Sequence, residues 1–320
     1  MRALVATHTD PTDPLAALAL TERDEPTPPA GWTVVEVRAA SVNHHDLWTL
    51  RGVATPAEHL PIVLGSDAAG VTVEGRPVIV HAVVPDHGAA AGDLRAGGSI
   101  LSERVDGTHA ERVAVPEANL VDKPEALTFA EAACLPTAWL TAYRALFTCA
   151  ALQPGQRLLV QGVAGGVATA ALLLARAAGV EVVATSRHAT ARARAEELGA
   201  AAALEPGSRV PARVDAVLDS VGEATFGHSL RSLRVGGSVV VVGATSGPNP
   251  PAELHRVFAR QLRVVGSSMG TRAELEALTR LLVTTGVRPL IADTMALAQA
   301  PEAYQRLAEG GVVGKLVVTP

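Results

Sequence analysis

A glycine-rich strand–turn–helix unit constrains the fold of this chain more than any other feature of its sequence. Residues 158–179, LLVQGVAGGVATAALLLARAAG, pass from an apolar run through a cluster of small residues into a long helical pattern. Similar patterns then alternate: we expect strands at 158–161, 181–184, 214–218 and 238–242, and helices at 165–178, 190–198 and 223–233. This alternation predicts right-handed crossovers and a parallel sheet covered on both faces, so the fold class is α/β.

The segments before and after this region predict a second domain. WTVVEVRAASVN, RPVIVHAVVP and HAERVAVPEANLV are short strand patterns between turns, which indicates an irregular β-barrel, while residues 86–107 show no period and predict a loop. The terminal GKLVVTP needs a sheet to join, and the barrel supplies one. We expect one domain from residues 1–120 and 267–320, and another from 121–266, which opens on a helix with Thr128 as N-cap and Glu131 at capping-box spacing.

The amino-acid composition of the chain limits the kinds of partner that it is expected to bind. The formal net charge is −5 and the 27 Lys and Arg residues are scattered, so nothing favours nucleic acid or an acidic membrane surface. Two cysteines, Cys134 and Cys149, exclude a disulfide scaffold and a four-cysteine zinc lobe. The first residues lack the pattern of a signal peptide, and Arg176 interrupts the longest apolar stretch. We expect a cytoplasmic protein that acts on a small-molecule substrate and binds neither nucleic acid nor membrane.

The glycine cluster predicts a dinucleotide site. A helix N-terminus offers unpaired N–H groups and a partial positive charge, and a pyrophosphate reaches them only where side chains are small. Gly162 serves the turn, Gly165 and Gly166 allow the close approach, Val167 follows them, and Ala168 contacts the sheet. A tight turn without a ligand is the alternative.

The end of the second α/β strand predicts the cofactor. An NAD-binding protein usually places an acidic residue here, but VVATSRHATAR contains none, and the first acid is Glu196. Thr185 and Ser186 offer hydroxyls and Arg187 a planar cation, which suit a ribose 2′-phosphate. An arginine solvated at a helix start is the alternative. We therefore expect NADPH.

These motifs together resemble the medium-chain dehydrogenase/reductase superfamily over essentially the whole chain. SVNHHDLWTLRG, LPIVLGSDAAGVTV, LTAYRAL, GVAGGVA, DSVG and GKLVVTP follow one another in the order of that superfamily. The resemblance implies a GroES-like barrel as catalytic domain, interrupted by a Rossmann domain that binds the cofactor. Relatives often form dimers through the edge of the Rossmann sheet, so the resemblance also implies a homodimer.

The resemblance places this chain among the members without zinc. Zinc enzymes of the superfamily hold the metal with Cys, His and Cys beside an acid; the corresponding positions here are Asn43, Ser66, Thr137 and Asp67. Those side chains lack the ligands that zinc prefers, and residues 86–107, where a structural zinc lobe would fall, contain no cysteine. A histidine site is the alternative, drawing on His44, His45, His81, His87 and His109. Neighbouring residues of an extended segment point to opposite sides, which argues against His44 and His45 sharing a metal.

Without a Lewis acid, simple alcohol oxidation is disfavoured. The resemblance then points to the quinone oxidoreductase-like branch, in which hydride goes to a quinone or an α,β-unsaturated carbonyl compound. Such acceptors delocalise the incoming charge, and water can supply the proton. Two rival hypotheses remain: an alcohol dehydrogenase-type enzyme that uses polar groups in place of zinc, and an NADPH-binding structural or sensing protein with little turnover, as in relatives of zeta-crystallin.

The resemblance also implies site residues. Asn43 and Asp46 are expected near the nicotinamide ribose, with a turn cap as the alternative for Asp46, and Trp48 is expected to wall the substrate pocket or else to belong to the core. Asp67 is expected to order the barrel. The residues expected to contact the nicotinamide half of the cofactor are Thr137, Thr141, Gly243, Ala244, Ser268 and Met269.

Overall fold

The computed structural model describes residues 1–53, 55–86 and 97–320, which form two compact units. One unit comprises Met1–Leu140 and Met269–Pro320, and the other comprises Thr141–Ser268. Of the loop predicted at 86–107, residues 87–96 lie outside the described residues, and His87 is one of them.

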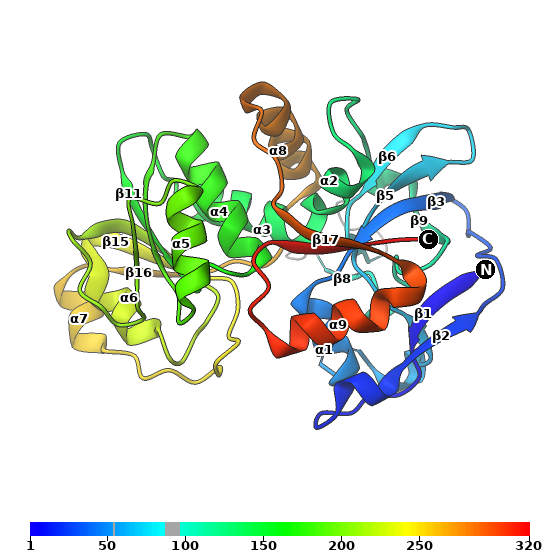
Figure 1. The fold of residues 1–320 in the computed structure, drawn as a ribbon, viewed down its shortest axis with the longest axis horizontal. Coiled ribbons are helices and arrows are strands. Elements are labelled where there is room, and N and C mark those ends of the chain that lie inside the picture. Colours follow the sequence, from blue (N-terminus) through cyan, green and yellow to red (C-terminus); the bar gives the residue numbers. More distant parts are fainter. Residues whose placement is uncertain (54, 87–96) are drawn as a thin grey trace. The chain divides into compact units, whose positions relative to one another are not determined.

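A mainly antiparallel sheet organises the first unit (Figure 1). Within the described residues its seven strands run in the order β10-β6-β5-β3-β18-β17, and β9 also pairs with β3. Smaller sheets pair β2, β1 and β4, and β7 with β8. The strands are β1 (Arg2–Ala6), β2 (Leu18–Glu22), β3 (Trp32–Ser41), β4 (Ile62–Val63), β5 (Asp67–Thr72), β6 (Pro77–Val80), β7 (Val83–Pro85), β8 (Gly98–Ile100), β9 (Arg112–Pro116), β10 (Leu120–Asp122), β17 (Ile291–Ala296) and β18 (Lys315–Thr319).

The C-terminal strand β18 completes this sheet. It pairs antiparallel with β3, so that Val317 lies opposite Ser41, and parallel with β17. The prediction that GKLVVTP joins the N-terminal barrel is therefore confirmed. This pairing brings Lys315 close to residues that precede it by more than 270 positions.

Helices cover the sheet of the first unit. They are α1 (His44–Leu50), α2 (Phe129–Ala133), the π-helical turn η5 (Leu135–Trp139), α8 (Arg272–Thr285) and α9 (Ala300–Glu309). The capping box predicted at Thr128 and Glu131 begins α2, with the Glu131 N–H donating to the Thr128 hydroxyl. Because α2 packs on β3 and β5, residues 121–140 lie in the first unit, whereas the sequence assigned them to the 121–266 domain.

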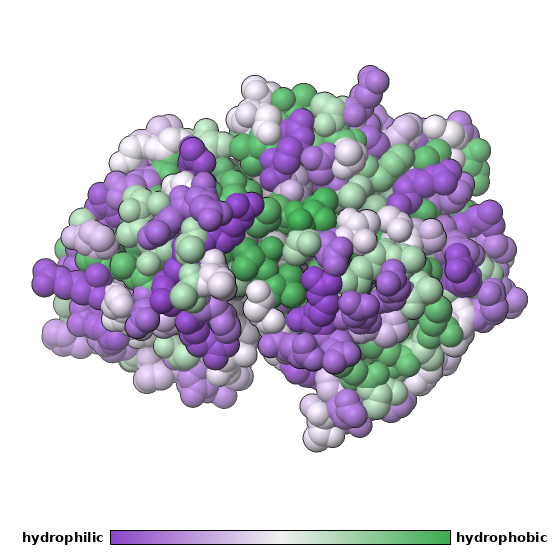
Figure 2. Space-filling model, viewed as in Figure 1, coloured by the Kyte–Doolittle hydropathy of each residue, from purple (hydrophilic) through white to green (hydrophobic). Residues whose placement is uncertain are grey.

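In α9, Ala303 and Tyr304 are fully buried, and Figure 2 shows mostly hydrophilic side chains over the helix's outer face.

The second unit is the predicted parallel α/β sheet. Its strands run in the order β13-β12-β11-β14-β15-β16, and each neighbouring pair is parallel. The strands are β11 (Arg157–Gln161), β12 (Glu181–Thr185), β13 (Ala202–Leu204), β14 (Val214–Asp219), β15 (Leu233–Val241) and β16 (Arg263–Gly266). The helices are α3 (Leu140–Tyr143), which begins at the unit boundary, the π-helical η6 (Arg144–Cys149), α4 (Gly166–Ala177), α5 (Ala189–Glu197), α6 (Phe226–Ser232) and α7 (Leu254–Ala259). The short strands β13 and β16 were absent from the prediction.

One edge of this sheet is exposed and partly apolar. Among the strands that the structure describes, β16 has a neighbour on one side only, and its Val264 is 52% exposed. Leu254 and Phe258 of α7 are about as open to solvent, at 68% and 69%. No helix in the described part of the chain combines the length and the apolar character that crossing a membrane requires.

Candidate active site and cofactor site

A buried cluster of polar side chains surrounds Asn43 in the first unit. Asn43 follows the end of β3 and precedes α1, and it is 6% exposed. Its amide Nδ2 donates to Asp67 Oδ2 at 2.8 Å, to the Ser41 carbonyl at 3.3 Å and to Ser66 Oγ at 3.4 Å. Its amide oxygen accepts from Lys315 Nζ at 2.5 Å. Asn43 is therefore hydrogen-bonded to each of Ser41, Ser66, Asp67 and Lys315, which form the cluster with it.

Asp67 is the anion of this cluster. It begins β5 and is fully buried, and its Oδ2 also accepts from the Ser41 hydroxyl at 2.6 Å. The Asp67 backbone carbonyl accepts from the Thr108 hydroxyl at 2.8 Å. Its Oδ1 has no hydrogen-bond partner among the described residues. These contacts agree with the expectation that Asp67 orders the barrel, although it does so from within the candidate site.

Lys315 is the cation of the cluster, and sequence reasoning missed it. Its ammonium lies 3.8 Å from Asp67 Oδ2 and donates to the Val42 carbonyl at 2.8 Å, and its side chain is only 4% exposed. Lysine is almost never buried unless it is paired. The available sign in the sequence was its place at the start of an otherwise apolar terminal strand.

Two hydroxyl groups, those of Ser66 and Thr137, continue the hydrogen bonding from the buried Asn43 towards the half-buried Thr137. Ser66 Oγ and Thr137 Oγ1 are 3.1 Å apart; Ser66 is fully buried and Thr137 is half-buried. Ser66 follows Gly65, whose φ of +95° suits glycine and where a Cβ would meet the His109 ring at 2.5 Å. Thr137 lies in the π-helical turn η5, a form of helix that is frequent at functional sites.

The donors at the three zinc-ligand positions do not fit zinc. The Asn43 oxygen already accepts from a positively charged ammonium, and the lone pair of an amide nitrogen is delocalised into the carbonyl, so the nitrogen offers none to a metal. Ser66 and Thr137 supply neutral hydroxyls, whereas zinc prefers thiolate, imidazole and carboxylate. In the described residues, no group of three or more His, Cys, Asp or Glu side chains could hold a metal ion.

The histidines considered as alternative ligands are dispersed. His44 is exposed on α1, and its neighbour His45 lies 3.8 Å from Glu103, with burial lowering the pKa of His45 to about 4. The His81 ring bonds the Gly270 carbonyl and accepts from the Val83 N–H. His109 Nδ1 lies 2.9 Å from the Tyr304 hydroxyl, and burial lowers the pKa of His109 to about 4.

Asp46 acts on the site through the backbone of Asn43. Its Oδ2 accepts from the Asn43 N–H at 2.7 Å, as one half of a capping box at the start of α1. Burial raises the pKa of Asp46 to about 7. Since Asp46 is fully buried, the structure supports the alternative of a cap, and contact with a reactant stays a prediction.

Trp48 is half-buried with the Arg51 guanidinium 5.4 Å from its ring centre, and its place in a substrate pocket also stays a prediction.

The glycine cluster of the second unit forms an open helix N-terminus. Gly162 has a φ of +71°, as a tight turn after β11 requires, and a Cβ there would lie 2.8 Å from Val221. Gly165 is the N-cap of α4 in extended conformation, and a Cβ built on it has no neighbour within 4 Å. Gly166 and Val167 begin the helix half-exposed, and Ala168 is buried against the sheet. A pyrophosphate site at a helix N-terminus requires such an open position beside the unpaired N–H groups of the first turn.

Two arginines lie beyond the end of β12. Ser186 is buried and its hydroxyl accepts from the His188 N–H, whereas Arg187 is exposed. Arg192 of α5, which the prediction did not include, donates to the backbone carbonyls of Ser186 and Arg187 at 2.8 and 3.2 Å. Arg192 therefore holds the segment that carries the two predicted 2′-phosphate ligands.

The remaining predicted cofactor residues are unequally accessible. Thr141 is buried, Gly243 and Ala244 are half-buried in the loop after β15, and Ser268 is exposed. Met269 has a φ of +53° and packs among Ala82, Val83 and Ile100 of the first unit. The Met269 side chain is thus occupied by packing, and the contacts of all these residues with a cofactor stay predictions.

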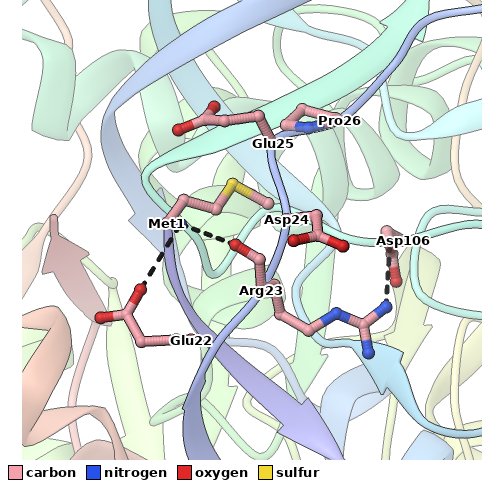
Figure 3. Close-up of a pocket in the computed structure, with 7 residues that line it drawn as sticks. All are labelled: Met1, Glu22, Arg23, Asp24, Glu25, Pro26 and Asp106. Atoms are coloured by element: carbon pink, nitrogen blue, oxygen red, sulfur yellow. Dashed lines mark hydrogen bonds and ion pairs between the residues drawn. The ribbon is translucent and has the colours of Figure 1, made fainter.

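A separate pocket of about 560 Å³ lies at the start of the chain (Figure 3). The Met1 ammonium donates to the Arg23 carbonyl and pairs with Glu22 at 3.5 Å, and the Arg23 guanidinium pairs with Asp106 at 3.7 Å. The pocket includes none of the predicted site residues, and its lining is acidic.

Comparisons with known proteins agree with this architecture. Residues 29–125 match the alcohol dehydrogenase GroES-like domain, and residues 166–284 match the family described as zinc-binding dehydrogenase. An acryloyl-coenzyme A reductase of Metallosphaera sedula is 30% identical over 93% of this chain and 95% of its own length. The acryloyl-coenzyme A reductase of Sulfurisphaera tokodaii is 25% identical over 96% and 98%. Among solved structures, a cobalt- and zinc-bound thermostable alcohol dehydrogenase of Pyrobaculum aerophilum is 30% identical with a TM-score of 0.88, over 100% of this chain and 99% of that chain.

Replacing the buried ammonium tests the charge balance of the cluster. Lys315→Met leaves Asp67 buried without its cation, so we expect the free energy of unfolding to fall by about 3–5 kcal/mol. Lys315→Met combined with Asp67→Asn removes both charges and should recover most of that loss. Urea denaturation of both variants and of Asp67→Asn alone measures this, and losses that simply add would contradict the pairing.

Asp46 predicts a pH dependence of stability. Its pKa is about 7 in the folded protein and 3.8 as the ordinary value, so between those values the folded state binds the extra proton. The stabilisation is full below the ordinary value and is lost as pH rises towards 7. Asp46→Asn cannot titrate and keeps an acceptor for Asn43. Its free energy of unfolding relative to wild type should rise by up to about 3 kcal/mol from pH 5 to pH 8. Urea denaturation measures both free energies of unfolding between pH 5 and pH 8. A difference between Asp46→Asn and wild type that stays constant with pH would refute the prediction.

Proposed function

Because the chain belongs to the medium-chain dehydrogenase/reductase superfamily, we propose that it transfers hydride from NADPH to an α,β-unsaturated carbonyl compound or a quinone without zinc. Members of the superfamily use a nicotinamide cofactor, so the chain is a nicotinamide-dependent oxidoreductase with a GroES-like domain and a Rossmann-type sheet. The observation that carries the finer proposal is the cluster in which Lys315 supplies the positive charge at Asn43.

The missing metal ligands favour an activated alkene over a simple alcohol. An alkoxide needs a strong Lewis acid beside it, whereas the negative charge left by hydride addition to an enone or a quinone is delocalised. Hydrogen bonds from preorganised donors stabilise such a charge. The acryloyl-coenzyme A reductases support this class, since their named substrate is an α,β-unsaturated thioester. Within the class, unsaturated acyl thioesters are therefore the first substrates to test.

NADPH is favoured by the residues after β12. Ser186 and Arg187 offer a hydroxyl and a cation, and the segment VVATSRHATAR carries no acid before Glu196 that would repel a 2′-phosphate. The cofactor, when bound, supplies the hydride. Gly165 and Gly166 would admit its pyrophosphate to the N-terminus of α4, and Thr141, Gly243 and Ala244 would orient the nicotinamide ring.

We propose a homodimer formed through the exposed edge of the second sheet. Strand β16 leaves backbone groups unpaired on its outer side, and the exposed Leu254, Phe258 and Val264 lie on β16 and its neighbour α7. A reducing, cytoplasmic location is supported by the free thiols of Cys134 and Cys149.

An acceptor panel tests the function. Purified protein, prepared without added metal, is mixed with NADPH and with crotonyl-coenzyme A, 2-cyclohexenone or 1,4-benzoquinone, and oxidation is followed by the cofactor's absorbance. We expect reduction of at least one activated acceptor, insensitivity to a chelator, and no oxidation of ethanol or 2-propanol with NADP⁺.

Chelator-sensitive alcohol oxidation with stoichiometric zinc would contradict the proposal and favour the alcohol dehydrogenase hypothesis. Tight NADPH binding with no turnover of any acceptor would favour a structural or sensing protein.

Two substitutions separate cofactor binding from cofactor choice. Gly165→Val fills the space for the pyrophosphate and should abolish binding of NADPH and NADH alike, while the open surroundings of Gly165 leave the fold stable. Arg187→Ala should weaken NADPH by roughly 1.5–3 kcal/mol and leave NADH nearly unchanged. Fluorescence titration with both cofactors and thermal unfolding on the same samples measure this. A folded Gly165→Val variant that binds NADPH normally would show that the cluster is only a turn.

A further inference from the structure

The hydrogen bonds around Asn43 have a direction that the buried ammonium imposes. Lysine has three donors and no acceptor, so the Asn43 atom facing Lys315 at 2.5 Å is its amide oxygen. The amide nitrogen then faces Asp67, which as a carboxylate can only accept. The orientation of the Asn43 amide is thus determined on both sides. One Nδ2 hydrogen goes to Asp67, and the second is shared between the Ser41 carbonyl at 3.3 Å and Ser66 Oγ at 3.4 Å, so in the Asn43–Ser66 contact Ser66 is the acceptor.

The direction of the Asn43–Ser66 hydrogen bond also determines the direction of the hydrogen bond between Ser66 and Thr137. Ser66 Oγ accepts from Asn43, and the described residues offer its hydroxyl hydrogen no acceptor besides Thr137 Oγ1 at 3.1 Å. If Thr137 donated instead, the hydrogen of the fully buried Ser66 would remain unpaired, which costs about 1–3 kcal/mol. Ser66 therefore donates to Thr137, and the Thr137 hydroxyl hydrogen is free to point away from the cluster.

Thr137 is the exposed end of this chain of donors. Lys315, Asn43 and Ser66 are at most 6% exposed, whereas Thr137 is half-buried. Each bond polarises the next, and at the inner end the Lys315 ammonium offsets the Asp67 carboxylate and polarises the Asn43 amide, so the terminal hydroxyl is a stronger donor than an isolated threonine. We propose that the Thr137 hydroxyl is a catalytic residue that donates a hydrogen bond to the carbonyl oxygen of the unsaturated substrate, a role that rests on the proposed function.

The chemistry balances without a proton from Thr137. The hydride pair forms a C–H bond at the β-carbon, the alkene electrons form the enolate double bond, and the carbonyl electrons move to oxygen. NADPH is thereby oxidised to NADP⁺. The Thr137 hydroxyl keeps its proton and stabilises the enolate oxygen, and the α-carbon then takes a proton from water. Ser66, Asn43 and Lys315 are positioning residues, since they act through Thr137.

The kinetic test compares Thr137→Val, which removes the hydroxyl at constant shape, with Thr137→Ser, which keeps it. In single-turnover reduction of crotonyl-coenzyme A by the NADPH complex, Thr137→Val should lower the rate roughly 10²-fold, the usual cost of one oxyanion donor. Thr137→Ser should restore most of the rate, and the Kd for NADPH should not change. The matched control is Thr279→Val, because the buried Thr279 hydroxyl serves only the Leu275 carbonyl within α8.

Ser66→Ala tests the relay behind Thr137. It should lower the rate less than Thr137→Val does, and the double variant should be no slower than Thr137→Val alone, because both changes act through one hydroxyl. Independent effects that multiply would refute the relay.

A binding test does not depend on turnover. 4-Nitrophenolate, an aromatic oxyanion that mimics an enolate, is titrated into the NADP⁺ complex and followed by its absorbance. Wild type and Thr137→Ser should bind it, and Thr137→Val should bind it about tenfold or more weakly, as expected for a hydrogen bond to a charged group. Binding with this pattern but no reduction of any acceptor would refute the proposed function alone.

Three results would overturn the assignment of Thr137. The first is an unchanged reduction rate in Thr137→Val, and the second is a loss of rate in Thr137→Ser as large as that in Thr137→Val. The third is a Thr137→Val variant that binds NADPH more weakly but reduces the substrate at the wild-type rate, which would mean that the hydroxyl bonds the carboxamide of the cofactor. Absence of 4-nitrophenolate binding to the wild-type complex would also count against it.

Discussion

The contact between the Lys315 ammonium and the Asn43 amide oxygen is the interaction on which the candidate site depends. It neutralises Asp67 in a place where an unpaired carboxylate would cost several kcal/mol, and it determines which way the Asn43 amide faces. The same contact joins the last strand of the chain to the loop after β3. Lys315 thus begins the strand that completes the sheet of the first unit, and its side chain organises the polar groups that the reaction would use.

The second unit depends on a different constraint, which is the absence of side chains at one helix N-terminus. Gly162 turns the chain at a positive φ and Gly165 leaves open space in front of the α4 N–H groups. An anion bound there would rely on backbone groups, so the site would tolerate a wide range of surrounding sequence. In the proposed function, the choice between cofactors would rest on Arg187, whose segment Arg192 holds.

Local patterns made much of this structure predictable, and long-range contacts did not. The helix beginning after Thr128 and the strands on either side of the glycine cluster follow from capping and hydrophobic periodicity, which act over a few residues. Strands β13 and β16 are short, and β13 is half-buried throughout while β16 is largely exposed, so neither shows that periodicity. Lys315 could not be assigned to the site because its hydrogen-bond partners Val42 and Asn43 lie more than 270 residues away and lysine is normally exposed. Thr137 was expected beside the cofactor, but its π-helical turn and its bond to Ser66 are tertiary features.

The central claim is that an ammonium, and not a metal, supplies the positive charge at Asn43. Diffraction data collected at the zinc absorption edge, from crystals grown in the presence of zinc, test it most directly. The account predicts density for the Lys315 side chain against the Asn43 amide oxygen and no anomalous peak between Asn43, Ser66 and Thr137. A strong anomalous peak within bonding distance of those three residues, with Lys315 turned away, would contradict it.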